Sequence, residues 1–395
     1  MTREEVKKEV LNISNNHILL ELPTSFGKTK LAIDRMKNIV SKISSPKILI
    51  VIPRLVLINN WKEELTKWGA KDLLDNIIFS TYISIPKHAA IWDVVIFDEC
   101  QHLSDRCQES LTCYTIKNSI FLSATVKKEL RYNLQMLYND IYCFKVSMKE
   151  AIDEEILPDP KVYLLPLSLS TGIPTESIIK NPNGKGLIET SWATRWPFIK
   201  QKEFKVKIYC TQKQYLEDLD SQIEYWKNRY MRTKNDIFKN KWLRLSGDRL
   251  KWLAEKKNPI IQSLLDLLQK ERTLTFCNNI NQTEELGSYC INSKNKESEK
   301  ILQDFNNEKI HHITACNMLN EGMNLVNCRI GIYANLNSSE IIIKQRLGRI
   351  LRHKDPIIII PYYKGTREEE LVQKMLEDYN PNLVTTINNI NEIKL

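Results

Sequence analysis

The chain has 395 residues, of which 42% are hydrophobic and 27% charged, and its formal net charge is +9. These values are typical of a folded globular protein, exclude an intrinsically disordered one, and predict two or three domains. No uncharged apolar run of about 18 residues occurs, and the N-terminus MTREEVKKEV lacks the apolar core of a secretory signal. The nine cysteines form no CxxC pair, so we expect reduced thiols in the cytoplasm and no cysteine-ligated metal.

The first part of the chain alternates apolar strands with amphipathic helices. Helices are expected over 29–40 and 59–68, and strands over 18–22, 48–52, 77–80, 94–97 and 120–123. This alternation predicts a parallel sheet with helices on both faces and with ligands at the carboxyl ends of its strands.

The first of these strands runs into the segment LPTSFGKTK, residues 22–30. Its end matches a phosphate-binding loop, in which backbone N–H groups and the lysine bind phosphates and the threonine hydroxyl binds Mg²⁺. Leu22 replaces the first glycine of that pattern, and a tight turn before a helix is the alternative for this segment alone. The residues expected to bind ATP are Thr24, Ser25, Phe26, Gly27, Lys28 and Thr29.

Two acids, Asp98 and Glu99, end the apolar strand in VVIFDECQH. A carboxylate at the end of a buried strand is unfavourable unless a cation lies there. In P-loop ATPases the first acid holds Mg²⁺ and the second activates the attacking water. A further strand then ends in two hydroxyls, Ser123 and Thr125, within FLSAT.

The acidic, proline-marked segment 148–160 predicts a crossing between domains at 1–147 and 161–395. After it we expect strands over 161–169 and 204–210, a loop or an exposed excursion over 170–186, and helices over 211–231 and 236–256 that form an inserted hairpin. From Pro259 onward the alternation returns, with strands over 274–277, 311–315, 330–334 and 357–361.

The inserted region, at about 205–257, is basic. The window from Arg195 to Lys257 holds 17 Lys/Arg and 8 Asp/Glu, an excess equal to the net charge of the whole chain, together with four of the eight tryptophans. Cations interleaved with aromatic rings are typical of a nucleic-acid surface. However, Leu216, Leu219, Ile223, Trp226 and Tyr230 follow helical spacing, so the rings are predicted to be core rather than base-stacking platforms.

The second domain carries two further motifs. TACNMLNEGMNL, residues 314–325, follows an apolar strand, and QRLGRILR, residues 345–352, places three arginines on a predicted helix. Guanidinium groups at this spacing suit charge-assisted hydrogen bonds to a γ-phosphate. For the second motif alone, a solvated basic helix face is the alternative.

The ordered motifs LPTSFGKT, DECQ, SAT, NEGMN and QRLGRILR together resemble superfamily 2 helicases and translocases of the DEAD/DEAH-like kind. Within that group the chain looks most like the XPB-type and phage branch-migration helicases. The segments ILIVIPRLVLINNW, STYIS and TLTFCNN are similar to motifs Ia, Ib and IV. Gln101 stands where relatives carry His or Asp, Asn324 stands where they often carry Asp, and no glutamine motif precedes the loop.

The resemblance implies two RecA-like domains that close on ATP and Mg²⁺. Thr29 and Asp98 would hold the metal, and Glu99, Gln345, Arg349 and Arg352 would be catalytic. Ser123 and Thr125 would couple the sites, and Asn324 would contact the nucleotide. The residues implied on the nucleic-acid path are Pro53, Arg54, Thr81, Glu321 and Gly322.

The resemblance favours an ATP-dependent helicase or translocase that acts on DNA in a bacterial or phage-infected cytoplasm, as a monomer and with a separate targeting protein. Three alternatives stay open: an RNA helicase, a P-loop ATPase that does not move nucleic acid, and a nucleic-acid-binding module with weak ATPase activity. Nucleic-acid-stimulated ATP turnover distinguishes these classes.

Overall fold

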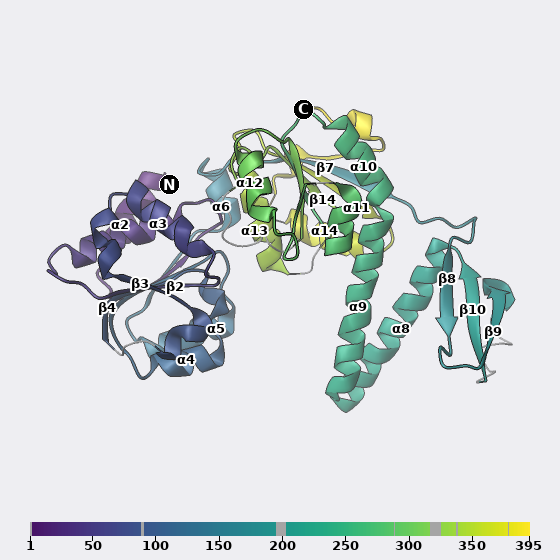
Figure 1. Cartoon of the computed structure of the whole chain (residues 1–395), viewed down its shortest axis with the longest axis horizontal. Coiled ribbons are helices and arrows are strands. Elements are labelled where there is room, and N and C mark those ends of the chain that lie inside the picture. The colour runs from purple at the N-terminus through teal and green to yellow at the C-terminus, as the bar shows by residue number, and fades with distance from the viewer. Residues whose placement is uncertain are drawn as a thin grey trace.

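The computed structural model describes residues 2–87, 91–194, 203–287, 289–316, 325–336, 339–377 and 379–395. Two α/β units lie side by side, and a pair of long helices with a small sheet projects from the second (Figure 1). The fold class expected from the sequence, two RecA-like parallel-sheet domains with a helical insertion, is confirmed.

The first unit is built on a six-stranded sheet in the order β3-β2-β4-β5-β1-β6, in which all pairs are parallel. Helices α2 and α3 cover one face and α4 and α5 the other (Figure 1), as the strand–helix alternation predicts. The strands are β1 (His17–Glu21), β2 (Ile48–Ile52), β3 (Ile77–Thr81), β4 (Ile91–Phe97), β5 (Thr115–Ser123) and β6 (Tyr142–Lys145). The helices are α1 (Arg3–Asn12), α2 (Lys28–Val40), α3 (Leu57–Lys67), α4 (Asp105–Leu111) and α5 (Lys128–Leu137).

The short helix α6 (Met148–Asp153) lies between the two units and begins with a capping box formed by Ser147 and Glu150. The second unit has a seven-stranded parallel sheet in the order β12-β13-β11-β14-β15-β7-β16. Its strands are β7 (Lys161–Leu167), β11 (Thr273–Phe276), β12 (Cys290–Ile291), β13 (His312–Ala315), β14 (Ile330–Tyr333), β15 (Ile357–Tyr363) and β16 (Val384–Thr386). Its helices are α10 (Asn258–Leu267), α11 (Ile280–Leu286), α12 (Ser298–Asn306), α13 (Glu340–Ile350) and α14 (Arg367–Leu376).

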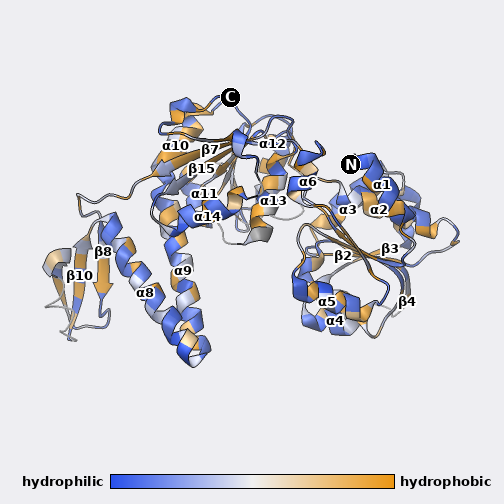
Figure 2. Ribbon diagram, turned by 180° about the vertical axis from the view of Figure 1, so that it is seen from behind, coloured by the Kyte–Doolittle hydropathy of each residue, from blue (hydrophilic) through white to orange (hydrophobic). Residues whose placement is uncertain are grey.

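Between β7 and α10 the chain leaves the second unit. Helices α8 (Gln212–Thr233) and α9 (Asp236–Lys256) form the expected hairpin, and polar and apolar residues alternate along both (Figure 2). The apolar stripe is buried at Leu216, Leu219 and Ile223, but Trp226 and Tyr230 are only half-buried.

A three-stranded sheet accompanies the hairpin, and here the sequence expectation is partly wrong. The segment 170–186, expected to be a loop or an exposed excursion, is not a plain loop, because it contains β8 (Glu176–Lys180) and the first residue of β9 (Gly186–Ser191). Both strands pair with β10 (Phe204–Cys210), β8 antiparallel and β9 parallel. Serine, asparagine and proline in and around these segments weaken the strand signal in the sequence, and both strands are stabilised by pairing with β10, which follows them in the chain.

All nine cysteines are free thiols, as expected. Cys100, beside the acidic pair, is buried, and burial raises the pKa of its thiol well above the usual value. A raised pKa keeps the thiol protonated and inert at neutral pH. Over the described residues, no helix is both long and apolar enough to cross a lipid bilayer.

Candidate active site

The segment between β1 and α2 has the backbone of a phosphate-binding loop. Gly27, which precedes α2, has φ +103°, and Ser25 also lies in the left-handed region, with φ +68°. Left-handed residues of this kind turn consecutive N–H groups toward a common point at a helix N-terminus, which suits an anion. Lys28 Nζ donates to the carbonyls of Leu22 (3.0 Å) and Pro23 (3.3 Å), and burial lowers the pKa of this lysine.

Asp98 and Glu99 follow β4 at the same edge of the sheet. The Asp98 amide donates to the carbonyl of Val51 (2.8 Å), and Glu99 adopts a left-handed conformation with φ +51°. Trp61 Nε1 donates to Asp98 Oδ2 at 2.9 Å. Burial, and then the neighbouring charge of Glu99, raise the pKa of Asp98 to about 6. A carboxylate in this state gains from a bound cation.

A chain of hydrogen bonds joins Glu99 to the hydroxyl motif after β5. Gln101 Nε2 donates to Glu99 Oε2 (2.9 Å), while Gln101 Oε1 accepts from Ser123 Oγ (2.6 Å). Ser123 Oγ in turn accepts from the amide of Thr125 (3.1 Å). Gln101, which departs from the family pattern, thus bridges the acid and the expected coupling pair, because an amide can donate and accept at once.

Helix α13 of the second unit contacts the phosphate-binding loop. Ser25 Oγ donates to the carbonyl of Gly348, and Arg352 Nε donates to Ser25 Oγ at 3.2 Å. A Cβ atom at Gly348 would clash with the hydroxyl and Cβ of Thr24, so only glycine permits this approach. The contact places Arg349 and Arg352 opposite the acids of the first unit.

These elements enclose a cavity of about 540 Å³, within the range of small-molecule sites. From the expected set, the cavity is lined by Thr24, Ser25, Phe26, Gly27, Lys28, Thr29, Asp98, Glu99, Arg349 and Arg352. The left-handed loop, the acids and the two arginines suit a magnesium nucleotide. Gln345, 1% exposed on α13, is not among the lining residues, and its Nε2 has no hydrogen-bond partner within the described residues.

The cavity also has walls that sequence reasoning missed. Arg3 and Lys7 of α1 line one part of it, and Asn60, Trp61 and Trp68 on or next to α3 line another. Trp61 could have been predicted from the sequence, because it is the last residue of the segment that is similar to motif Ia.

The expected nucleic-acid residues of the first unit lie together at the carboxyl edge of its sheet. Ile52 at the end of β2 is in register with Thr81 at the end of β3, so Pro53, Arg54 and Thr81 are neighbours. Arg54 is exposed, and none of the three lines the cavity. Glu321, Gly322 and Asn324 lie outside the described residues.

Two family models match the chain in order. The type III restriction enzyme res subunit matches residues 3–128, and the helicase conserved C-terminal domain matches residues 256–354. The residues matched by each model line one side of the cavity. The chain belongs to the superfamily 2 helicases. Members of these families hydrolyse ATP to move along or separate nucleic acids, and this helicase is such an ATPase.

Individual relatives agree with this assignment. The helicase is 24% identical to the DNA 3'-5' translocase XPB2 of Sulfurisphaera tokodaii, over 91% of this chain and 80% of that protein. Its fold is similar to S. cerevisiae Dbp5 bound to RNA and ADP BeF3 (TM-score 0.61, 10% identity, 98% and 89% of the chains). It is also similar to the Pyrococcus furiosus Hef helicase domain (TM-score 0.52, 15% identity, 94% and 97%).

Proposed function

We propose that this protein is an ATP-driven translocase or helicase that acts on DNA. The observation that carries the proposal is the shared cavity, in which the phosphate loop and acids of one unit face the arginines of the other. Because neither unit holds the complete set, turnover requires both units to be closed on the nucleotide.

We assign the roles within that cavity as follows. Lys28 and the amides of residues 24–29 bind the phosphates, and Thr29 and Asp98 would hold Mg²⁺. Magnesium ATP supplies the phosphoryl group whose transfer to water drives the cycle. Glu99 accepts a proton from the attacking water at a carboxylate oxygen. Arg349 and Arg352 neutralise charge on the γ-phosphate, a contribution of roughly 10³–10⁵ in rate for such arginines, and Gln345 completes the catalytic set.

Ser123 and Thr125 then couple the site to the nucleic acid. Their hydrogen bonds through Gln101 to Glu99 give movement at the acid a direct route to the end of β5. The nucleic acid is contacted by Pro53, Arg54 and Thr81 of the first unit and by Glu321 and Gly322 of the second. Asn324 of the second unit contacts the nucleotide. The nucleic-acid contacts are to phosphate and sugar, so sequence preference is weak.

The similarity to a DNA translocase along 91% of the chain supports DNA over RNA as the substrate. We place the domain boundaries at 1–147, 148–160 and 161–395, with the basic insertion in the second domain. The nine free thiols support action in a reducing bacterial or phage-infected cytoplasm. We also propose that the protein acts as a monomer and works with a separate targeting protein.

The decisive experiment measures ATP turnover with single-stranded DNA, duplex DNA, forked DNA and RNA in parallel, with Lys28→Ala as the inactive control. We expect stimulation by DNA above that by RNA, and no turnover by the variant. Stimulation by none of the four overturns the proposal in favour of a switch or kinase. Stimulation by RNA alone, or binding without turnover, overturns the choice of DNA or the assigned catalysis.

A further inference from the structure

Asp98 is held by hydrogen bonds from three segments of the first unit. The first is the strand pair that it extends, because its amide donates to the carbonyl of Val51 just beyond the last residue of β4. The two neighbouring crossings contribute one side chain each, Trp61 from α3 and Tyr82 from the 3₁₀-helix η2 (Tyr82–Lys87). The amide, the carbonyl and the carboxylate of Asp98 are thus all fixed by other parts of the chain.

The Trp61 indole holds the carboxylate. Its Nε1 donates to Oδ2 of Asp98 at 2.9 Å, and Trp61 is 3% exposed within the main hydrophobic core. An ionised carboxylate has about four acceptor positions on its two oxygens, and one indole N–H occupies one of them. Because Asp98 also lines the nucleotide cavity, the remaining positions are available to a metal ion there.

The Tyr82 hydroxyl holds the backbone beside that carboxylate. It donates to the carbonyl of Asp98 at 2.6 Å, and Tyr82 is itself buried, with its own carbonyl accepting from Cys107 Sγ at 3.1 Å. The carbonyl of Asp98 belongs to the peptide that joins it to Glu99, which has φ +51°. The Tyr82 bond therefore fixes the orientation of the peptide between the two acids.

The alternative is that both bonds merely satisfy buried donors, as nearly all buried N–H and O–H groups require. Trp68 shows what that arrangement looks like in the same cavity, since its Nε1 donates to Glu64, four residues before it in the chain, at 2.6 Å. Trp61 and Tyr82 instead reach across to another segment. Both end on the same residue, the acid to which the magnesium role is assigned.

We propose that Trp61 and Tyr82 are positioning residues, which hold Asp98 in the orientation that Mg²⁺ requires. The proposal rests on the role of Asp98 in the proposed function. Mg²⁺ demands nearly ideal octahedral geometry and short distances to its oxygen ligands, so a ligand that can turn away binds it poorly. Hydrogen bonds from outside the ligand set that orient a metal ligand typically contribute about 10–100-fold in metal affinity.

The test measures binding of a non-hydrolysable ATP analogue by calorimetry, without metal and at several Mg²⁺ concentrations, so that no turnover is needed. Trp61→Phe keeps an aromatic ring and removes the N–H. The Mg²⁺ concentration that gives half of the gain in analogue affinity should rise about 10–100-fold in this variant. Tyr82→Phe removes one hydroxyl from a bond to a neutral acceptor and should raise it about 2–10-fold. Analogue affinity without metal should stay near that of the parent in both variants.

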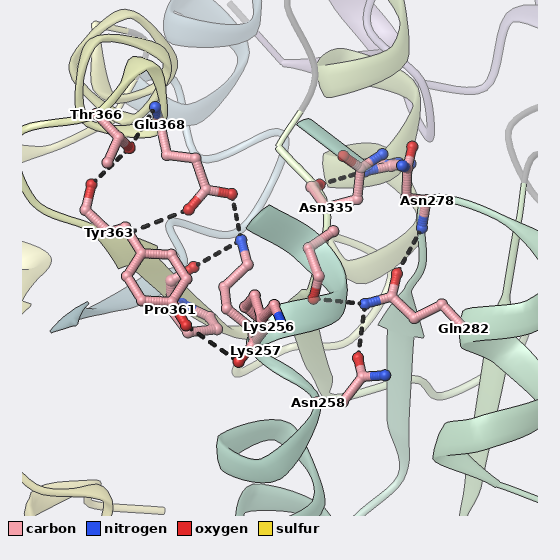
Figure 3. A network of polar contacts seen from close by, with 12 residues as sticks. Lys256, Lys257, Asn258, Asn278, Gln282, Asn335, Pro361, Tyr363, Thr366 and Glu368 are labelled. Carbon is pink, nitrogen blue, oxygen red and sulfur yellow. Dashed lines mark hydrogen bonds and ion pairs between the residues drawn. The ribbon is translucent and has the colours of Figure 1, made fainter. Parts of the chain in front are cut away.

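Two matched controls remove the same donors elsewhere. Trp68→Phe removes an indole N–H from the same cavity. Tyr363→Phe removes a hydroxyl that donates to a backbone carbonyl, that of Lys256, at 3.0 Å in the second unit (Figure 3). Tyr363 and Tyr82 are both 5% exposed, so the two tyrosine variants lose equally buried hydroxyls. Neither control residue bonds to Asp98, and the magnesium dependence of both controls should match that of the parent. Shifts as large as those of the test variants would overturn the proposal.

The metal-free measurement separates positioning from packing. If Trp61→Phe weakens analogue binding equally with and without Mg²⁺, the ring is only a wall of the cavity and the proposal is overturned. Tyr82→Phe removes a single oxygen, so it decides the question if the larger substitution unfolds the protein. An unchanged magnesium dependence in Tyr82→Phe would likewise overturn the proposal.

Asp98→Ala separates this proposal from the proposed function. If that variant keeps the magnesium dependence of the parent, the metal is held elsewhere, and both the role of Asp98 and its positioning are overturned. If Asp98→Ala loses the dependence while Trp61→Phe and Tyr82→Phe keep it, Asp98 holds the metal and only the positioning is overturned. Loss in all three variants, with both controls unchanged, is the expected result.

Discussion

Replacing Lys257 with methionine should destabilise the second domain severely. Its ammonium and the Glu368 carboxylate are 0% and 1% exposed, and Glu368 Oε2 also accepts the Tyr363 amide at 3.0 Å. The substitution leaves a buried carboxylate without its cation, which costs about 3–5 kcal/mol. At about 2–4 °C per kcal/mol for a domain of this size, the melting temperature should fall by on the order of 6–20 °C.

Two further variants separate charge pairing from packing. In Lys257→Met/Glu368→Gln the charge is gone while the amide oxygen can still accept from Tyr363, so the double variant should be at least about 2 kcal/mol more stable than Lys257→Met. Lys256→Met, one residue away, removes a partly exposed pair with Glu176 and should cost about 0–1 kcal/mol.

Calorimetric unfolding of the four proteins provides the measurement. A loss below about 1 kcal/mol for Lys257→Met, or a double variant no more stable than the single one, would refute the reasoning. Either result would mean that water reaches the carboxylate or that the pair does not fix the end of α9 to α14.

Other predictions concern the nucleotide site. Glu99→Gln should stop turnover yet retain ATP and hold DNA at least as tightly, since the role proposed for the acid is to activate water and not to bind nucleotide; failure to bind ATP in a filter assay would argue against this role. Gly348→Ala should place a methyl group against Thr24 and prevent closure, lowering kcat by about 10³ or more while ATP still binds the first domain; an unchanged kcat would show that the contact between domains is dispensable. Because the pKa of Asp98 is raised to about 6, a proton competes with Mg²⁺ below that pH, and affinity for the magnesium nucleotide should fall about tenfold per unit there; calorimetric titrations giving equal affinities at pH 5 and 7 would contradict it.

Some of this architecture was predictable from the sequence, because local patterns produce it. Continuous apolar runs such as 48–52 and 357–361 form buried parallel strands in the structure, and the spacing around Gly27 and Lys28 produces the loop at the end of β1. The hairpin followed from helical periodicity, and α9 spans 236–256 as expected. In each case the signal and the structure involve the same short stretch of chain.

Other features depend on residues far apart in sequence, and only the tertiary structure decided them. The role of Gln101 depends on Ser123, the bond of Trp61 depends on Asp98, and the need for glycine at 348 depends on Thr24. The β8 and β9 strands had weak local signals and form by pairing with β10. Helical spacing predicted that the rings of Trp226 and Tyr230 belong to the core, yet both are only half-buried in the structure. Their covered faces became visible only when α9 brought Lys241 over Trp226, because a helical repeat specifies which residues share a face and not what lies across from it.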